Sequence, residues 1–299
     1  MYELIQVANN TYYVNCPAKI GIYRCEDNGV YLIDSGNDKD AGRRVRRVLD
    51  AEGWTVKAIL NTHANADHIG GNKYFQQNTG CKIFAPGIDA DITRHPILEP
   101  AFLYGGYPCK PLRHKFLMAQ ESDCADVTSP DFPEGFEVIP LPGHFFDMVG
   151  YRTPDDVVFL ADCVSSPATL EKYQIGFIYD VKAYLDTLDK IEAMTAKAFV
   201  PSHAEVCADM HELAELNRKK VLEIADKLLG LCSEPLSFET ILQRVFTHYG
   251  LTLDFEQYVL VGSTVRSYLS WLYDSGRVTV LFKDNLMLWQ TANLTACCL

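Results

Sequence analysis

Hydrophobic and polar residues alternate along the beginning of the chain as they do in β-strands. In residues 2–13 and 18–33, apolar side chains recur at about every second position, and turn-forming residues interrupt the pattern at 9–10 and 27–29. This arrangement predicts β-hairpins. In residues 41–52 the apolar side chains lie three or four positions apart, which predicts a helix with its arginines on the solvent side.

Strand and helix patterns alternate through the middle of the chain. Strand-like apolar runs at 56–60 and 82–85 enclose a helical pattern at 72–78, which is the order of a βαβ unit. Two longer amphipathic helices are expected at 181–197 and 207–231. The order of these elements predicts an α/β fold.

Two segments lack any periodicity and are rich in aromatic residues. Residues 88–133 and 164–180 have no clear strand or helix pattern, and the first also collects many prolines and glycines. Long irregular segments often form lids or walls of substrate sites. Short helices packed as scaffold are the alternative for part of the first segment. We expect substrate-recognition residues in both segments, and the second contains Lys172, Tyr173 and Tyr179.

The C-terminal part of the chain has the pattern of a small separate module. A linker-like stretch at 230–236 divides a main domain, 1–232, from this module, 233–299. The expected elements are helices at 237–250, from 254 onward and at 263–274, then two strands within 277–290 around a turn at 283–285.

The composition limits the kinds of molecule that the protein is expected to bind. A length of 299 residues and 48% hydrophobic content allow a sizeable core. The formal charge of −12 argues against broad binding to nucleic acid or anionic membranes, because those surfaces attract basic proteins. A small-molecule substrate is therefore favoured. With no signal-peptide pattern and no apolar run of about 18 residues, we expect a cytoplasmic protein with no membrane partner.

The cysteines form no recognisable disulfide or zinc-ribbon framework. None of the ten belongs to a CxxC pair, so we expect reduced thiols in core positions. Cys163 is next to a candidate metal ligand, Asp162. Neighbouring residues on a strand point to opposite faces, so Cys163 is expected to be a small buried side chain.

Residues 61–71, NTHANADHIGG, hold the densest group of metal-type ligands. His63, Asn65, Asp67 and His68 lie within six residues, between a strand pattern and a helix pattern. Imidazole nitrogen and carboxylate oxygen are donors that Zn²⁺ accepts, and a strand end can hold them in fixed directions. An ordinary polar loop is the alternative for this stretch alone.

Three later apolar runs each end in one further ligand-type residue. These are His144, Asp162 and His203. Strand ends on one rim of a sheet can converge, so these side chains are expected to join the first group. His95 and His114 have no such placement, and we expect neither to be a ligand.

The order of these residues resembles the five motifs of the metallo-β-lactamase-fold hydrolase superfamily. The match runs from His63-x-Asn65-x-Asp67-His68 through Pro142-Gly143-His144 to Asp162 and His203, and it covers roughly residues 1–205. The resemblance implies an αββα sandwich with the site at one rim. It also implies one metal position made by Asp67, His68 and His203, a second made by His63, Asn65 and His144, and Asp162 reaching both.

Asp34 follows a strand pattern, in a place similar to the family's first motif. By resemblance, it would support the site without binding metal, and a turn-forming carboxylate is the alternative.

One residue departs from the family pattern. The pattern is His-x-His-x-Asp-His, and Asn65 stands where the second histidine is expected. A neutral amide oxygen is a poorer zinc ligand than an imidazole nitrogen. We therefore expect one or two zinc ions, with the second weakened by Asn65; iron or manganese are the alternatives. Asn65 could instead hydrogen-bond substrate or a metal-bound water.

These residues together predict a metal-dependent hydrolase. A cation at an open site lowers the pKa of bound water to about 7, and Asp67 would orient the resulting hydroxide towards a small ester, thioester, lactone or related substrate. Two other functions remain open. One is iron-dependent oxidation, which flavodiiron proteins and persulfide dioxygenases perform on the same scaffold. The other is a binding or regulatory role, if the site is degenerate.

Three helices followed by a hairpin resemble a winged helix, which some members of this superfamily carry at the C-terminus. Winged helices often bind DNA, but residues 233–299 contain four Lys or Arg and six Asp or Glu. Phosphate contacts supply most of the affinity for nucleic acid. We therefore expect packing, homodimer formation or covering of the active site from this module.

Overall fold

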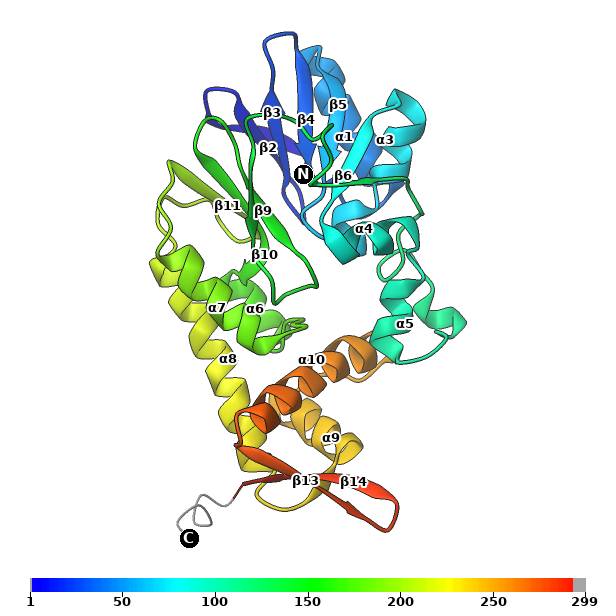
Figure 1. Ribbon diagram of the computed structural model, residues 1–299, viewed down its shortest axis with the longest axis vertical. Helices are drawn as coiled ribbons and strands as arrows, with labels where there is room; N and C mark the ends of the chain where they lie inside the picture. Colours follow the sequence, from blue (N-terminus) through cyan, green and yellow to red (C-terminus); the bar gives the residue numbers. More distant parts are fainter. Residues whose placement is uncertain (1, 293–299) are drawn as a thin grey trace.

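A seven-stranded sheet forms the first layer of the computed structural model, which describes residues 2–292 (Figure 1). The strands follow one another in sequence order, and the first four pair antiparallel as the expected hairpins, while the later ones pair parallel. They are β1 (Glu3–Ala8), β2 (Thr11–Asn15), β3 (Ile20–Arg24), β4 (Gly29–Ile33), β5 (Thr55–Leu60), β6 (Lys82–Ala85) and β7 (Ala125–Asp126).

Helices α1 (Lys39–Glu52) and α3 (Asn72–Thr79) cover the outer face of this sheet. The side chain of Asp38 accepts a hydrogen bond from the Ala41 amide and caps α1, as the helix pattern requires. Apolar residues of both helices pack against strands β2 to β6 in one buried cluster.

A four-stranded sheet packs against the inner face of the first sheet. Its spatial order is β11 (Ala198–His203), β10 (Val157–Ser165), β9 (Val149–Arg152) and β8 (Glu137–Pro140). Leu60 and Phe84 of the first sheet share a buried cluster with Tyr151, Phe159 and Val200 of the second. Helices α7 (Val181–Glu192) and α8 (His211–Leu231) cover the other face. The predicted α/β class is therefore confirmed.

Both segments expected to be irregular contain short helices. The first holds α4 (Gly87–Arg94), α5 (Leu98–Tyr104) and the 3-10 helix η1 (Lys110–Leu112), and the second holds α6 (Pro167–Tyr173). The scaffold alternative is therefore the correct one for much of the first segment. Elements of three to eight residues are too short to show helical periodicity.

The C-terminal part contains β12 (Leu236–Ser237), α9 (Phe238–Tyr249), α10 (Phe255–Asp274), β13 (Val278–Lys283) and β14 (Leu286–Thr291). Two separate helices were expected from 254 onward and at 263–274, and that prediction was wrong, because α10 is continuous. Buried residues of α10 continue through the expected break, from Val259 to Leu272, so packing along one face offsets the low helix propensity of Gly262. The likeness to a winged helix stays a prediction.

The C-terminal elements share a hydrophobic core with the rest of the protein. One buried cluster continues from β10 through α7 and α8 to α9 and α10, and a smaller one joins Leu103, Leu112 and Leu117 to Val259 of α10. Figure 1 shows α10 crossing beneath α7 and reaching α5. The division at residue 232 stays a prediction.

Two further observations concern only the part of the chain that the structure describes. No helix there is long and apolar enough to cross a membrane. The eight cysteines there are free, and Cys163 is fully buried with its pKa raised by burial and by Asp162. Cys297 and Cys298 lie outside the described residues.

Candidate metal centre

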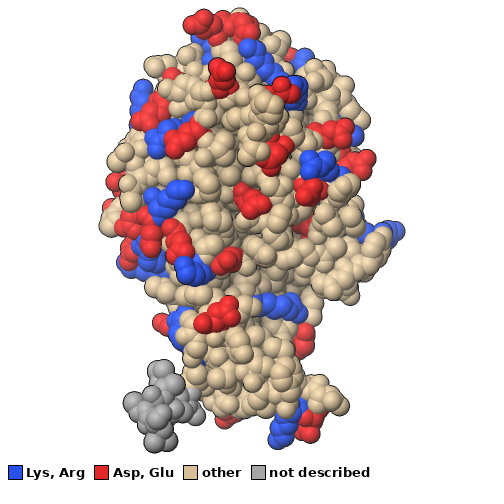
Figure 2. All heavy atoms as spheres, viewed as in Figure 1, with Lys and Arg blue, Asp and Glu red and all other residues tan. Residues whose placement is uncertain are grey.

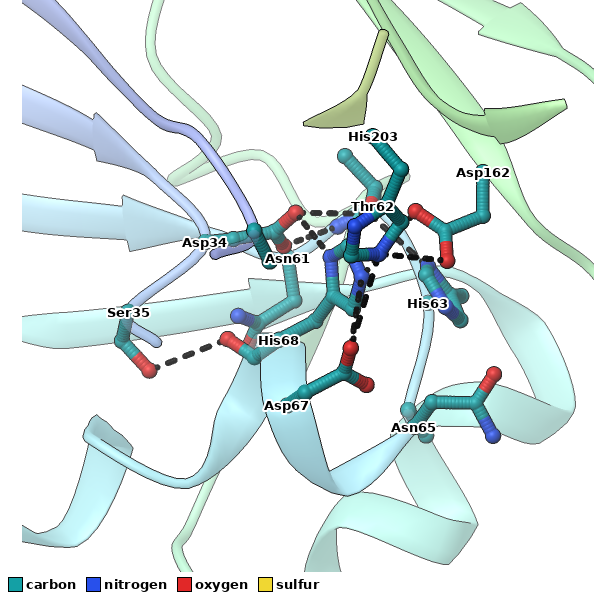
Figure 3. Close-up of polar contacts among 12 residues, drawn as sticks. Asp34, Ser35, Asn61, Thr62, His63, Asn65, Asp67, His68, Asp162 and His203 are labelled. Carbon is teal, nitrogen blue, oxygen red and sulfur yellow. Dashed lines mark hydrogen bonds and ion pairs between the residues drawn. The ribbon is translucent and has the colours of Figure 1, made fainter. Parts of the chain in front are cut away.

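The loop after β5 is fixed by Asp34, which follows β4. The Asp34 carboxylate accepts hydrogen bonds from the Thr62 amide and hydroxyl, both at 2.8 Å. Its Oδ2 also lies 2.8 Å from Nδ1 of His68 (Figure 3). Both side chains are buried, so this contact turns Nε2 of His68 towards the opposite sheet.

A single helical turn presents the next two ligand candidates. Asn65 precedes α2 (Ala66–Ile69), which contains Asp67 and His68. The turn lies directly against the chain after β4: the Ser35 amide donates to the His68 carbonyl at 2.8 Å. A Cβ at Gly71 would approach the Ser35 carbonyl oxygen to 2.2 Å, so the close contact requires glycine.

The second sheet supplies the remaining candidates. His144 lies in the loop after β8, and His203 is the last residue of β11. Asp162 was expected to end its strand, and that prediction was wrong, because β10 continues to Ser165. The strand pairing is irregular around Ala161, which has a φ of 51°. Such an irregularity can re-aim a side chain, and here Asp162 faces the site while the strand goes on.

Four side chains meet at a first position. His68 Nε2 lies 3.1 Å from Asp162 Oδ1 and 3.8 Å from Asp67 Oδ2. His203 Nε2 lies 3.2 Å from Asp162 Oδ2 and 3.6 Å from Asp67 Oδ2. One ligand atom from each of the four lies within 4.8 Å of the others. The structure therefore brings Asp67, His68, Asp162 and His203 together around one point.

A second position lies beside the first. His63, His144 and Asp162 also bring ligand atoms within 4.8 Å of one another. Asn65 Oδ1 lies 3.1 Å from His144 Nε2, so the amide oxygen faces this position. All seven candidates thus lie at one rim between the two sheets, and Figure 3 shows Asn65 to one side of the His68, Asp162 and His203 group.

Sequence reasoning missed the residue that orients Asn65. Glu99, in α5, is buried, and its Oε1 accepts a hydrogen bond from Asn65 Nδ2 at 2.7 Å. The nitrogen of the amide is thereby turned away from the metal positions and the oxygen towards them. A buried carboxylate partner in a segment without periodicity left no signal in the sequence.

The two positions differ in their charges. Burial alone would lower the pKa of His68, but Asp162, Asp67 and Asp34 raise it well above the usual range. Asp162 likewise raises the pKa of His203 to about 10. Burial instead lowers the pKa of His63 and His144. The carboxylates Asp67 and Asp162 have lowered pKa values, because nearby imidazoles outweigh their burial.

Unpartnered polar atoms show that the residues fit a cation. His63 Nε2 is buried and has no hydrogen-bond partner among the described residues, and His68 Nε2 faces only the carboxylates of Asp162 and Asp67, which are themselves ligand candidates. Nδ1 of His144 lies 3.0 Å from the Phe177 carbonyl, which only accepts, so the other ring nitrogen presents a lone pair to Asn65 Oδ1. Lone pairs directed at one point are stabilised by a cation between them.

Comparison with known proteins agrees with this geometry. Residues 14–203 match the sequence profile of the metallo-beta-lactamase superfamily. The chain belongs to this superfamily. That stretch reaches from the first sheet to His203 and contains every ligand candidate.

Curated proteins similar to this chain include hydroxyacylglutathione hydrolases. The one from Rhodopseudomonas palustris is 40% identical over 160 residues, which are 50% of this chain and 53% of the relative. The one from Erythrobacter litoralis is 26% identical over 201 residues, 64% of this chain and 66% of the relative. The chain therefore spans about half to two thirds of the length of these relatives.

Solved structures share the metallo-beta-lactamase fold at low sequence identity. A beta-lactamase domain protein from Burkholderia ambifaria has a TM-score of 0.73 and 16% identity, covering 97% of this chain and 94% of that one. A metallo-beta-lactamase family protein from Thermus thermophilus has a TM-score of 0.70 and 17% identity, covering 92% of this chain and 94% of that one. The likeness of fold thus extends into the C-terminal part.

A cavity of about 640 Å³ opens beside the first position of this superfamily member. Asp67 and His203 lie in its wall, together with Phe116 from one expected wall segment and Lys172 and Tyr173 from the other. The prediction that both segments contribute to a substrate wall agrees with this lining. Tyr179 lines a different hollow, and His114 lies 2.8 Å from Glu256 in an ion-pair contact away from the candidate ligands.

Proposed function

We propose that this protein is a metal-dependent hydrolase that cleaves small thioesters. The observation that carries the proposal is the convergence of Asp67, His68, Asp162 and His203 beside an open cavity, whose wall includes Asp67 and His203. The names of the curated relatives, hydroxyacylglutathione hydrolases, support thioesters within the broader class of esters and lactones.

Zinc is the proposed metal, with one ion bound tightly by Asp67, His68, Asp162 and His203. A second, weaker ion would be held by His63, His144, Asn65 and the shared Asp162. Bound metal supplies a Lewis acid and an activated water for hydrolysis. Iron or manganese would satisfy the same donors, so elemental analysis of the purified protein is the first measurement.

Asp67 is the proposed catalytic residue. Its side chain is 43% exposed and lines the cavity, whereas Asp162 is only 11% exposed. Asp67 can therefore orient the attacking water while facing substrate. His68 is held by Asp34 and cannot turn towards the cavity without losing that hydrogen bond.

Lys172 is the proposed recognition residue for an anionic substrate. Among the described residues of the cavity wall, it is the single Lys or Arg. Its Nζ lies 2.9 Å from the Tyr173 hydroxyl oxygen and 4.5 Å from the centre of that ring. The aromatic rings of Tyr2 and Phe116 line the same cavity. This combination suits an acyl or thiol group that carries a carboxylate.

The test is a panel of esters, thioesters, lactones and phosphodiesters assayed with the metal found in the protein. We expect the highest kcat/KM for thioesters of carboxylate-bearing thiols or acids. Lys172→Met should raise the KM for these substrates about five-fold with little change in kcat, because an exposed ion pair contributes up to about 1 kcal/mol. Lys219→Met, on the exposed face of α8, is the matched control.

Two results would contradict this proposal. Equal turnover of neutral and anionic thioesters would show that Lys172 does not recognise a negative charge on the substrate. Iron in the purified protein together with oxygen consumption would favour the oxidative alternative on the same fold.

We also propose a small-molecule substrate and a homodimer for the complete protein, with no nucleic acid partner. On the face shown in Figure 2, acidic and basic side chains are interspersed, and few basic ones lie over the C-terminal part. The β13–β14 hairpin exposes Phe282, which is 79% accessible, beside Leu286 and Met287. Exposed apolar groups of this kind suit contact with a second copy. Sedimentation of the wild type and of Phe282→Glu tests the dimer.

A further inference from the structure

The ring of His144 is oriented by a backbone carbonyl from a distant segment. Its Nδ1 lies 3.0 Å from the carbonyl oxygen of Phe177, which follows α6. A carbonyl only accepts hydrogen bonds, so Nδ1 is the protonated nitrogen in this contact. The contact thereby fixes which nitrogen of His144 is free to face the second metal position.

The same peptide unit is held from its other side by the C-terminal helix. The carbonyl of Phe177 and the amide of Ile178 belong to one planar trans peptide, so they point in opposite directions. The Ile178 amide donates to Thr264 Oγ1 of α10 at 3.1 Å, and this contact is buried. One rigid peptide is therefore clamped between His144 and Thr264.

The hydrogen bond between Thr264 and the Ile178 amide lies in the protein interior. Thr264 and Ile178 are both buried, in the region where α10 packs against the 174–180 loop. A buried amide that lost Thr264 Oγ1 would be left without an acceptor, which disfavours the present orientation of the peptide. Rotation of the peptide to find another acceptor would also turn the Phe177 carbonyl away from His144.

We infer that Thr264 of α10 is a positioning residue for the metal-ligand candidate His144, acting through the peptide between Phe177 and Ile178. The inference rests on the metal centre of the proposed function. It assigns the C-terminal part a role in building the second metal position. Every ligand candidate precedes residue 204, so the motifs alone do not show this role.

The test compares three full-length variants. Thr264→Val keeps the shape of the side chain and removes the acceptor, whereas Thr264→Ser keeps the hydroxyl. Ser270→Ala is the control, because it removes a hydroxyl from an exposed position of the same helix. Zinc affinities of both positions are measured by chelator competition. The protonated nitrogen of His144 is identified by ¹H–¹⁵N spectroscopy of the zinc-loaded protein, with His144→Gln for assignment.

We expect Thr264→Val to weaken the second zinc ion about ten-fold, at the lower end of the effects known for residues that orient a ligand. The first ion should bind as in the wild type, and the Nδ1–H signal of His144 should shift or broaden. Thr264→Ser and Ser270→Ala should match the wild type in both measurements.

Two results would overturn the inference. One is a Thr264→Val protein with unchanged zinc affinities and an unchanged His144 signal. The other is an equal loss in Thr264→Ser, which would assign the effect to the packing of the methyl group. Because no readout uses turnover, a protein that binds zinc as described without cleaving thioesters would contradict the proposed function and still support this inference.

Discussion

The two metal positions share Asp162 but are built from different parts of the molecule. The first combines Asp67 with His68 and His203, which a single helical turn and a strand end hold in place. Its further support is Asp34, which comes from the neighbouring strand of the same sheet. This position is therefore built from strand ends of the two sheets and from the helical turn after β5.

The second position depends on segments far from the ligand motifs. Glu99 of α5 orients Asn65, and the peptide after Phe177 orients His144. Its own donors are two imidazoles and an amide, so the shared Asp162 is its single carboxylate. This site therefore pairs a metal position that has two carboxylates, Asp67 and Asp162, with a weaker one whose ligands are oriented by α5 and by the loop after α6.

The largest expected effect is on the first position. Asp67→Asn keeps the size of the side chain but removes the charge that binds metal and orients the attacking water. We expect kcat/KM for thioesters to fall about 10²-fold or more, because misplacement of a reacting group alone costs that much. Steady-state kinetics at saturating zinc provide the measurement. Asp91→Asn, whose partner Arg94 lies in an exposed ion pair, is the control.

Wild-type turnover by Asp67→Asn with normal metal content would show that the catalytic centre lies elsewhere. A loss of turnover in both Asp67→Asn and Asp91→Asn would instead point to a general effect of removing surface charge.

A smaller effect is expected when the second position is disturbed through Glu99. Glu99→Ala frees the amide of Asn65, so the second zinc ion should bind about 10–100-fold more weakly, as for other lost ligand-orienting partners. Glu99→Gln keeps an acceptor oxygen and should retain most of the affinity. Competition titration with a chromophoric chelator measures both variants. Equal zinc binding by Glu99→Ala and the wild type would refute the orienting role.

Much of the fold follows from local patterns. The hairpins of β1 to β4 and the helices α1, α3, α7, α8 and α9 have periodicity and turn or cap signals that agree with their tertiary contacts. The break expected within α10 was wrong because the buried face of the helix continues from Val259 to Leu272, so tertiary packing decided the outcome. The helices α4 and α5 were too short for their spacing to be informative.

The ligand candidates could be predicted from the sequence. The residues that orient them could not. Residues that can bind metal recur after strand patterns in the sequence. We could therefore select His63, Asp67, His68, His144 and His203 as candidates from the sequence alone. The irregular backbone at Ala161 turns the Asp162 side chain towards the site within its strand. No pattern in the sequence predicts this irregularity. Glu99 and Thr264 act through contacts 34 and 86 residues distant in the chain, beyond the reach of periodicity.

The most direct test of the proposed difference in zinc affinity between the two positions is calorimetric titration of metal-free protein with zinc. The titration compares the wild type with Asn65→His. The account predicts one tight ion and a clearly weaker second ion in the wild type. Asn65→His should strengthen the second ion by about ten-fold, equal to roughly 1.4 kcal/mol, because imidazole is the better zinc ligand. Two equally tight ions in the wild type, unchanged in Asn65→His, would contradict it.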